Sequence, residues 1–150
     1  MMKTLSPNQM AMLLPLTLFA HQLEEYFGGF PLWYSKLLDA QLSNQDFIMI
    51  NGVGLFIIAG FSLSYLINKN NLILAALGTL IFVNGIIHLA LSIFTLSYSP
   101  GVISGVILFL PLGTGIYKRI LPELKDRDKI AAISIGILFL IFVSMIAMNI

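Results

Sequence analysis

The sequence predicts an all-α membrane protein, a polytopic helix bundle with five transmembrane helices and one short interfacial helix. Two observations predict this fold class. Charged residues make up 10% of the chain and hydrophobic residues 58%, whereas an average soluble domain has about 25% charged residues. The charges also fall in short segments, with long uncharged runs between them. At this length we expect one domain, residues 1–150, and no segment repeats at a fixed period.

Long uncharged runs give the number of membrane spans. A bilayer core takes about 20 apolar residues of helix, and the run between Lys69 and Lys118 is long enough for two such helices. The stretch "YSPG", residues 98–101, divides this run, because proline disfavours helix in the residue before it and glycine readily ends a helix. With the other uncharged runs, the predicted spans are residues 7–27, 46–68, 71–95, 101–117 and 130–149.

A short segment after the first span is predicted to form the interfacial helix. Residues 31–42, "PLWYSKLLDAQL", place Trp33 and Leu37 on one helical face and Lys36 on another. Pro31 suits the first position of a helix. Because tryptophan and tyrosine gather at membrane interfaces, we expect this helix to lie along the outer membrane surface.

Lysines and arginines are distributed unevenly between the two sides of the predicted bundle. With five spans, the N-terminus, the loop at Lys69 and residues 118–129 share one side, which holds seven of the eight. Lys36 lies on the other side. Cytoplasmic loops carry an excess of these residues, so we expect a cell-membrane protein with its N-terminus in the cytoplasm and its C-terminus outside. The mixed charges of "KDRDK" indicate a solvated loop, and no nucleic-acid partner is expected.

The first span carries ionisable residues near its outer end. In "HQLEE", His21 and Glu25 are about 40° apart around the helix, and Glu24 lies about 60° to the other side of His21. The three side chains therefore project within one arc, and Thr17 extends this polar face inward by one turn. Two neighbouring carboxylates cannot both ionise without cost, so we expect a proton or a cation between them.

The third span places a second histidine at the same depth. Asn84, His88 and Ser92 repeat every four residues, so they share one face. Helix rise puts His88 and His21 each about 10 Å below the outer end of its helix. Alternatively, the carboxylates are interfacial groups in reach of water and His88 is a single core histidine. Because ionisable groups inside a membrane are costly and usually functional, we expect one cavity to collect both histidines and both glutamates.

Two histidines and two glutamates offer nitrogen and oxygen ligands to a divalent metal such as zinc, iron or manganese. The expected metal ligands and catalytic residues are His21, Glu24, Glu25 and His88. Three ligands and an open position would hold a metal-activated water, with the remaining glutamate as general base. Tyr98, predicted at the same outer face, would donate to an oxyanion or to a substrate headgroup. The chain has no cysteine, which excludes thiolate metal sites and disulfides.

Three motifs, in this order, resemble those of a known family. "HQLEE", the histidine of a later span and "YSPG" match the HxxEE motif, the further histidine and the YxPG motif of the HXXEE family of small bacterial membrane proteins. The resemblance covers most of the chain. It implies an uncharacterised family whose motifs indicate an enzymatic role without an assigned reaction. The family positions carried over to this chain are His21, Glu24, Glu25, His88, Tyr98, Pro100 and Gly101.

Three classes of function fit these observations. The first is a membrane enzyme acting on a lipid or another hydrophobic substrate, since a site about 10 Å deep among apolar helices is easily reached from the bilayer. The second is a proton or cation transporter, although few polar residues continue the path into the cytoplasmic half. The third is a non-catalytic assembly or binding protein, in which the polar residues hold helices together. We favour the membrane enzyme, and the partner that we expect for this protein is the lipid bilayer.

Overall fold

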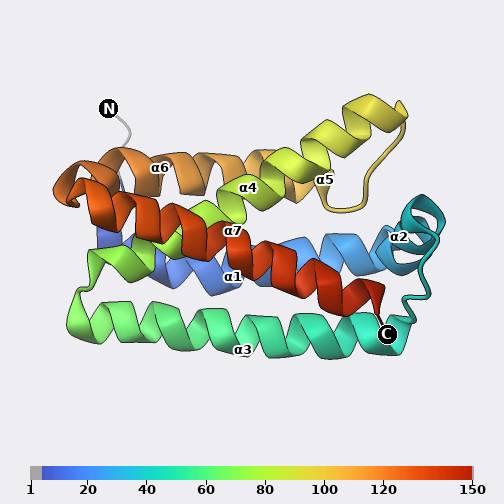
Figure 1. Ribbon diagram of the computed structural model, residues 1–150, viewed down its shortest axis with the longest axis horizontal. Helices are drawn as coiled ribbons and strands as arrows, with labels where there is room; N and C mark the ends of the chain where they lie inside the picture. The colour runs from blue at the N-terminus through green and yellow to red at the C-terminus, as the bar shows by residue number, and fades with distance from the viewer. Residues whose placement is uncertain (1–4, 150) are drawn as a thin grey trace.

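Every regular element in residues 5–149, the range that the computed structural model describes, is helical (Figure 1). This confirms the all-α fold class. The elements are α1 (Pro7–Phe27), α2 (Phe30–Leu38), α3 (Asn44–Asn68), α4 (Asn71–Thr95), α5 (Val102–Ser104), the π-helix η1 (Gly105–Phe109), α6 (Leu110–Ile120), the 3-10 helix η2 (Leu121–Glu123) and α7 (Asp126–Met148). The four elements from α5 to η2 follow one another as a single helical segment, Val102–Glu123.

Four helices in the described residues, rather than the predicted five, are long and apolar enough to cross a membrane. They are α3, α4, the segment Val102–Glu123 and α7. α1 has the predicted bounds and 21 residues, but Asn8 and Gln9 lie in its first turn and the polar residues of "HQLEE" lie near its end. It still packs along α3 and α6 within the bundle (Figure 1). The polar residues of α1 lower its hydropathy, so α1 is not among the candidate spans. The prediction of five spans is therefore wrong.

The helical segment that starts at Val102 contains one wider turn, the π-helix η1. The amide of Leu110 donates to the carbonyl of Gly105, five residues before it. Pro111 follows directly, and a proline inside a helix lacks an amide hydrogen and crowds the carbonyl one turn earlier. The wider turn accommodates this proline, and such turns occur frequently at functional sites.

α4 is the central helix, and glycines let its neighbours approach it closely. A Cβ atom at Gly136 of α7 would lie 2.7 Å from the carbonyl oxygen of Ala76 and 2.7 Å from Cβ of Thr79. A Cβ atom at Gly113 of α6 would lie 2.7 Å from Cβ of Phe82. These separations leave no room for a larger residue, so the two glycines set how closely α7 and α6 pack on α4.

Hydrogen bonds tie three segments together at one end of the bundle. Nζ of Lys69 donates to Oδ1 of Asn8 at 3.0 Å, and Nδ2 of Asn71 donates to Oε2 of Glu123 at 2.7 Å. The start of α1, the turn between α3 and α4 and the turn between α6 and α7 therefore share this end. α2 and the last turn of α7 lie at the opposite end (Figure 1).

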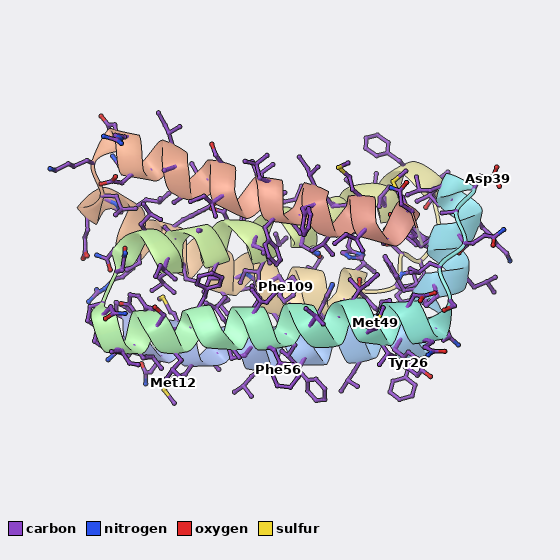
Figure 2. All side chains as sticks on the ribbon, turned by 60° about the horizontal axis from the view of Figure 1, so that its bottom comes forward. Met12, Tyr26, Asp39, Met49, Phe56 and Phe109 are labelled. Atoms are coloured by element: carbon purple, nitrogen blue, oxygen red, sulfur yellow. The ribbon has the colours of Figure 1, made fainter. Side chains whose placement is uncertain are left out.

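α2 lies across that opposite end of the bundle (Figures 1 and 2). The helix predicted for residues 31–42 is observed at Phe30–Leu38. It ends at Asp39, whose backbone is left-handed, with φ of 51°. Tyr34 is buried, and its hydroxyl donates to the carbonyl of Ser144 in α7 at 3.3 Å. α2 is thereby attached to the end of the bundle.

Large apolar side chains cover the outside of the bundle. Met12, Met49 and Phe56 point away from it (Figure 2), and Phe56 is 82% exposed. Phe109, in contrast, is fully buried among the helices. A soluble domain rarely exposes such a continuous apolar surface, whereas lipid tails favour it, and helices satisfy their own backbone hydrogen bonds there.

Candidate functional site

Three predicted site residues meet in one buried group. His21 and Glu25 lie one turn apart on α1, and His88 lies on α4. Nε2 of His88 is 3.3 Å from Oε1 of Glu25, and Nε2 of His21 is 3.5 Å from the same oxygen. The centres of the two imidazole rings are 4.9 Å apart. All three side chains are buried, and we call them the His/Glu/His group.

The His/Glu/His group has a geometry that suits a metal ion. One ligand atom from each residue lies within 4.8 Å of the other two. Nε2 of His21 is buried and has no hydrogen-bond partner among the residues that the structure describes. A buried polar atom without a partner costs about 1–3 kcal/mol, and a cation bound to this nitrogen would remove that cost. Two imidazoles and one carboxylate are a ligand set that proteins use for zinc.

Two serines fix the orientation of the histidine rings. The hydroxyl of Ser104 donates to Oε2 of Glu24. Because a hydroxyl carries a single proton, the Ser104 oxygen must accept from Nδ1 of His21, which is 2.8 Å away. Nδ1 of His88 lies 3.2 Å from the hydroxyl of Ser99. With a proton on Nδ1, Nε2 is the nitrogen of His21 that faces the centre of the group, as in metal-binding histidines.

Glu24 faces away from the His/Glu/His group and belongs to a second network. Its carboxylate accepts from the backbone amides of Ile103 at 3.0 Å and Ser104 at 2.6 Å, and from the hydroxyl of Tyr98 at 2.8 Å. The two amides belong to the N-terminus of the helical segment after "YSPG", where a negative charge is favoured. The sequence predicts Glu24 as a metal ligand, whereas the structure uses it to join α1 to that segment.

The "YSPG" loop packs directly on the His/Glu/His group. Gly101 has a left-handed backbone, with φ of 97°. A Cβ atom at this position would lie 2.7 Å from Cε1 of His21 and 2.9 Å from Cε1 of His88. Pro100 is also buried, against Gly28 at the end of α1. Glycine is therefore required at position 101 both for the backbone conformation and for the approach to the two rings.

Tyr98 lies at the rim of the site and is 47% exposed. Desolvation, together with the hydrogen bond to the Glu24 carboxylate and its negative charge, raises the pKa of Tyr98 to about 12. The phenol therefore stays protonated at neutral pH and donates to Glu24. In this arrangement its proton is engaged, so Tyr98 supports Glu24 rather than pointing a free donor at an oxyanion.

Sequence reasoning missed three residues that shape the site. They are Ser99, Ser104 and Phe109, whose ring centre lies 4.3 Å from that of His21. Ser99 lies inside "YSPG", but at the position that the YxPG motif leaves open. Ser104 and Phe109 had no signal in the sequence, since they reach the histidines only through the turn at Gly101 and the π-helix.

A cavity of about 310 Å³ opens beside the His/Glu/His group. All three residues of the group line it, as do the aromatic rings of Phe30 and Trp33 from α2. Most of its other walls are apolar side chains of α2, α3, α4 and α7. Asn84 also lines it, and Oδ1 of Asn84 is buried without a hydrogen-bond partner in residues 5–149. An apolar cavity with a few converging polar groups is the usual form of a small-molecule site.

Comparison with known proteins agrees with the motifs of the site. The model of a family described as proteins of unknown function with an HXXEE motif matches residues 12–116, more than half of the chain. This range includes "HQLEE", His88 and "YSPG". No curated protein and no solved structure matches the chain. The chain therefore belongs to the HXXEE family, whose function is unknown.

Proposed function

We propose that this protein is an integral-membrane enzyme that uses a divalent metal, such as zinc or iron, bound by His21, Glu25 and His88. The convergence of two Nε2 atoms on one carboxylate oxygen, at 3.5 and 3.3 Å, carries the proposal. Both Nδ1 atoms face serine hydroxyls, which leaves the Nε2 atoms for a ligand. A lone pair of His21 facing a carboxylate oxygen is unfavourable unless a cation or a proton lies between them. A metal ion would bind all three ligand atoms at once, whereas protons would have to bridge each histidine to Glu25 separately.

The remaining residues would support a metal in this position. Two histidines and one carboxylate leave a coordination position for water, and a bound metal would lower the pKa of that water or polarise a substrate oxygen. Glu24 acts indirectly, because it holds Ser104, which in turn holds Nδ1 of His21. Glu24 is thus a positioning residue, supported by Tyr98.

The surroundings of the site favour a lipid or another hydrophobic substrate. The cavity beside the His/Glu/His group is lined mainly by apolar and aromatic side chains. The outside of the bundle is apolar as well, so a substrate dissolved in the bilayer would reach the protein without crossing water. The function that this geometry supports best is metal-dependent hydrolysis or modification of such a substrate.

Metal analysis of the detergent-purified protein tests this proposal. We expect about one equivalent of a divalent metal in the unaltered chain and its loss in Glu25→Gln and His21→Ala, since each change removes one ligand. Glu123→Gln is a matched control, because Glu123 is exposed at the far end and glutamine can still accept from Asn71. That variant should keep its metal.

A different result would assign the group another role. If zinc, iron and manganese are absent from the unaltered protein and do not bind when added, the His/Glu/His group is a hydrogen-bonded link between α1 and α4. The metalloenzyme would then be rejected, and a proton or cation transporter or an assembly or binding protein would remain.

A further inference from the structure

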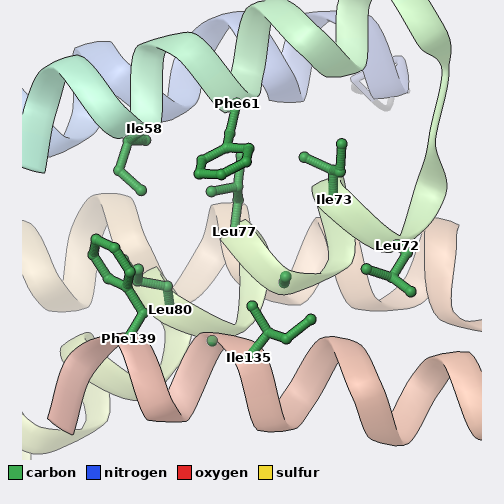
Figure 3. Close-up of a pocket in the computed structure, with 10 residues that line it drawn as sticks. Ile58, Phe61, Leu72, Ile73, Leu77, Leu80, Ile135 and Phe139 are labelled. Atoms are coloured by element: carbon green, nitrogen blue, oxygen red, sulfur yellow. The ribbon is translucent and has the colours of Figure 1, made fainter. Parts of the chain in front are cut away.

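A second cavity lies beside the site cavity, between the same three helices. It has a volume of about 250 Å³, and its lining is entirely apolar. Figure 3 shows Ile58 and Phe61 of α3 on one side and Ile135 and Phe139 of α7 on the other. Side chains of α4 form the floor, among them Leu77. We call this space the α3/α7 crevice.

On α4 and α7, the positions that line the α3/α7 crevice adjoin those that line the site cavity. On α7 the crevice is lined as far as Phe139 and the site cavity from Leu140 onward. On α4 the crevice is lined from Leu72 to Leu80, and the site cavity starts at Asn84, one turn later. The two spaces therefore follow each other along the bundle, from the His/Glu/His group toward the end that holds the α3/α4 turn.

The packing of the helices explains why the crevice stays open to lipid. Gly136 brings α7 so close to α4 that a Cβ atom would be 2.7 Å from the Ala76 carbonyl. α3 packs mainly on α1 and has few contacts with α7. Phe61 and Ile135, on the two walls, are each 49% exposed. Hydrocarbon fits this space, because no lining side chain offers a donor or an acceptor that needs a partner.

The near end of the crevice lies within the reach of one hydrocarbon chain from the His/Glu/His group. On α4, Leu80 and Leu72 precede His88 by eight and sixteen residues, which is about 12 and 24 Å along a helix. Half of a bilayer core, the length of one lipid tail, is about 15 Å. A tail that starts at the His/Glu/His group therefore ends inside the crevice.

Asn84 adds an independent sign of a ligand between the two spaces. It lies one turn from His88 and one turn from Leu80. Its Oδ1 is buried and accepts no hydrogen bond from the part of the chain described. A ligand that passes from the group into the crevice, with a hydroxyl or amide proton near its polar end, would satisfy this acceptor.

We propose that the α3/α7 crevice binds the hydrocarbon chain of a lipid whose polar end lies at the His/Glu/His group and carries a hydrogen-bond donor. This inference rests on the proposed function, since it defines the substrate of the same site as a lipid with at least one long chain. Asn84 recognises the donor, and the apolar walls hold the tail.

Tryptophan quenching tests the position of the tail. Trp33 is the only tryptophan of the chain, so a Trp33→Phe background allows one new tryptophan at a time. Ile135→Trp reports on the crevice, and Leu138→Trp is the matched control, because Leu138 lies on the same helix, is 62% exposed and does not line the crevice. The probe is a monoacylglycerol brominated near the end of its chain, the part that would enter the crevice, added in rising mole fraction to phosphatidylcholine vesicles.

We expect Ile135→Trp to reach half-quenching at about a tenfold lower mole fraction than Leu138→Trp, a preference equivalent to about 1.4 kcal/mol. Adding His88→Gln to the Ile135→Trp protein should abolish the preference, because the polar end loses its partner. Parallel quenching of the two reporters would overturn the inference, since the crevice would then hold only bulk lipid. A preference that persists with His88→Gln would also overturn it, because the crevice would bind chains independently of the site.

Metal content, measured on the same preparations, separates this inference from the proposed function. Bound metal with parallel quenching would leave the metalloenzyme standing and remove only the lipid-tail assignment. If the Ile135→Trp reporter is quenched preferentially, this preference depends on His88, and the protein holds no metal, the lipid-tail assignment would stand and the metalloenzyme would be rejected.

Discussion

Ser104 connects the two polar networks of the site through a single hydroxyl. It donates to Glu24 and accepts from Nδ1 of His21. We expect Ser104→Ala to weaken zinc binding by about 10- to 100-fold, because removal of a partner that orients a metal-binding histidine has effects of this size. The fold should persist, since Glu24 keeps the amides of Ile103 and residue 104. Competition with a colorimetric zinc chelator measures the change in affinity.

Ser134→Ala is the matched control for this experiment. Ser134 is exposed on α7 and makes no contact with the site. Its replacement should leave zinc affinity unaltered. If Ser104→Ala binds zinc as tightly as the control, the orientation of His21 does not depend on the hydroxyl, and the role given to Glu24 is wrong.

Helix periodicity predicted that His21, Glu25 and His88 lie close together, but it did not predict the partners of Glu24. His21 and Glu25 meet because they are four residues apart, and His88 meets them because the two helices place their histidines at equal depth. Glu24 lies within the same arc by sequence, yet it turns toward the amides of Ile103 and Ser104. Those amides come almost eighty residues later in the chain, so no local pattern could have shown that Glu24 has other partners.

At the scale of the helices, hydrophobic runs predicted the existence and the approximate ends of the long elements. α1 and α4 have the predicted bounds. The number of candidate spans was wrong, because α1 carries the polar site residues that lower its hydropathy. The π-helix was not predicted, although Pro111, which its wider turn accommodates, is visible in the sequence. Hydropathy is thus a poor indicator of membrane spanning for a helix that contributes polar residues to a buried site.

The contact between α4 and α7 depends on the missing side chain of Gly136. We expect Gly136→Ala to lower the free energy of unfolding by about 1–3 kcal/mol, because the new Cβ atom would be 2.7 Å from the Ala76 carbonyl and the helices must separate. Gly54→Ala is the matched control, since a Cβ atom at Gly54 has nothing within 4 Å. It should be neutral or stabilising by about 0.5–1 kcal/mol, as expected for glycine replaced within a helix.

Unfolding of these variants by SDS titration, followed by circular dichroism, measures both effects. Equal midpoints for Gly136→Ala and Gly54→Ala would show that α7 does not depend on its close approach to α4. The crevice beside that contact would then have to be reconsidered, because its floor is set by the same two helices.

For the molecule as a whole, charge distinguishes the two ends of the bundle. Lys36 lies on α2 at one end, and most other lysines and arginines lie at the opposite end. Within the described residues these are Lys69, Lys118, Arg119, Lys125, Arg127 and Lys129, and Lys3 lies outside that range. The hydrogen bonds from Lys69 to Asn8 and from Asn71 to Glu123 place the start of α1 at this basic end. The start of α1 therefore lies with these basic residues at one end of the bundle, whether or not α1 spans the membrane.

The basic end should face the cytoplasm, because cytoplasmic loops are enriched in lysine and arginine. A reporter domain inserted near Asp126 should then lie in the cytoplasm, and a reporter fused to the C-terminus should lie outside it. Alkaline phosphatase and a fluorescent protein that folds in the cytoplasm give opposite signals for the two sides. The opposite pattern would place the His/Glu/His group in the cytoplasmic leaflet, and its lipid substrate would have to enter from that side.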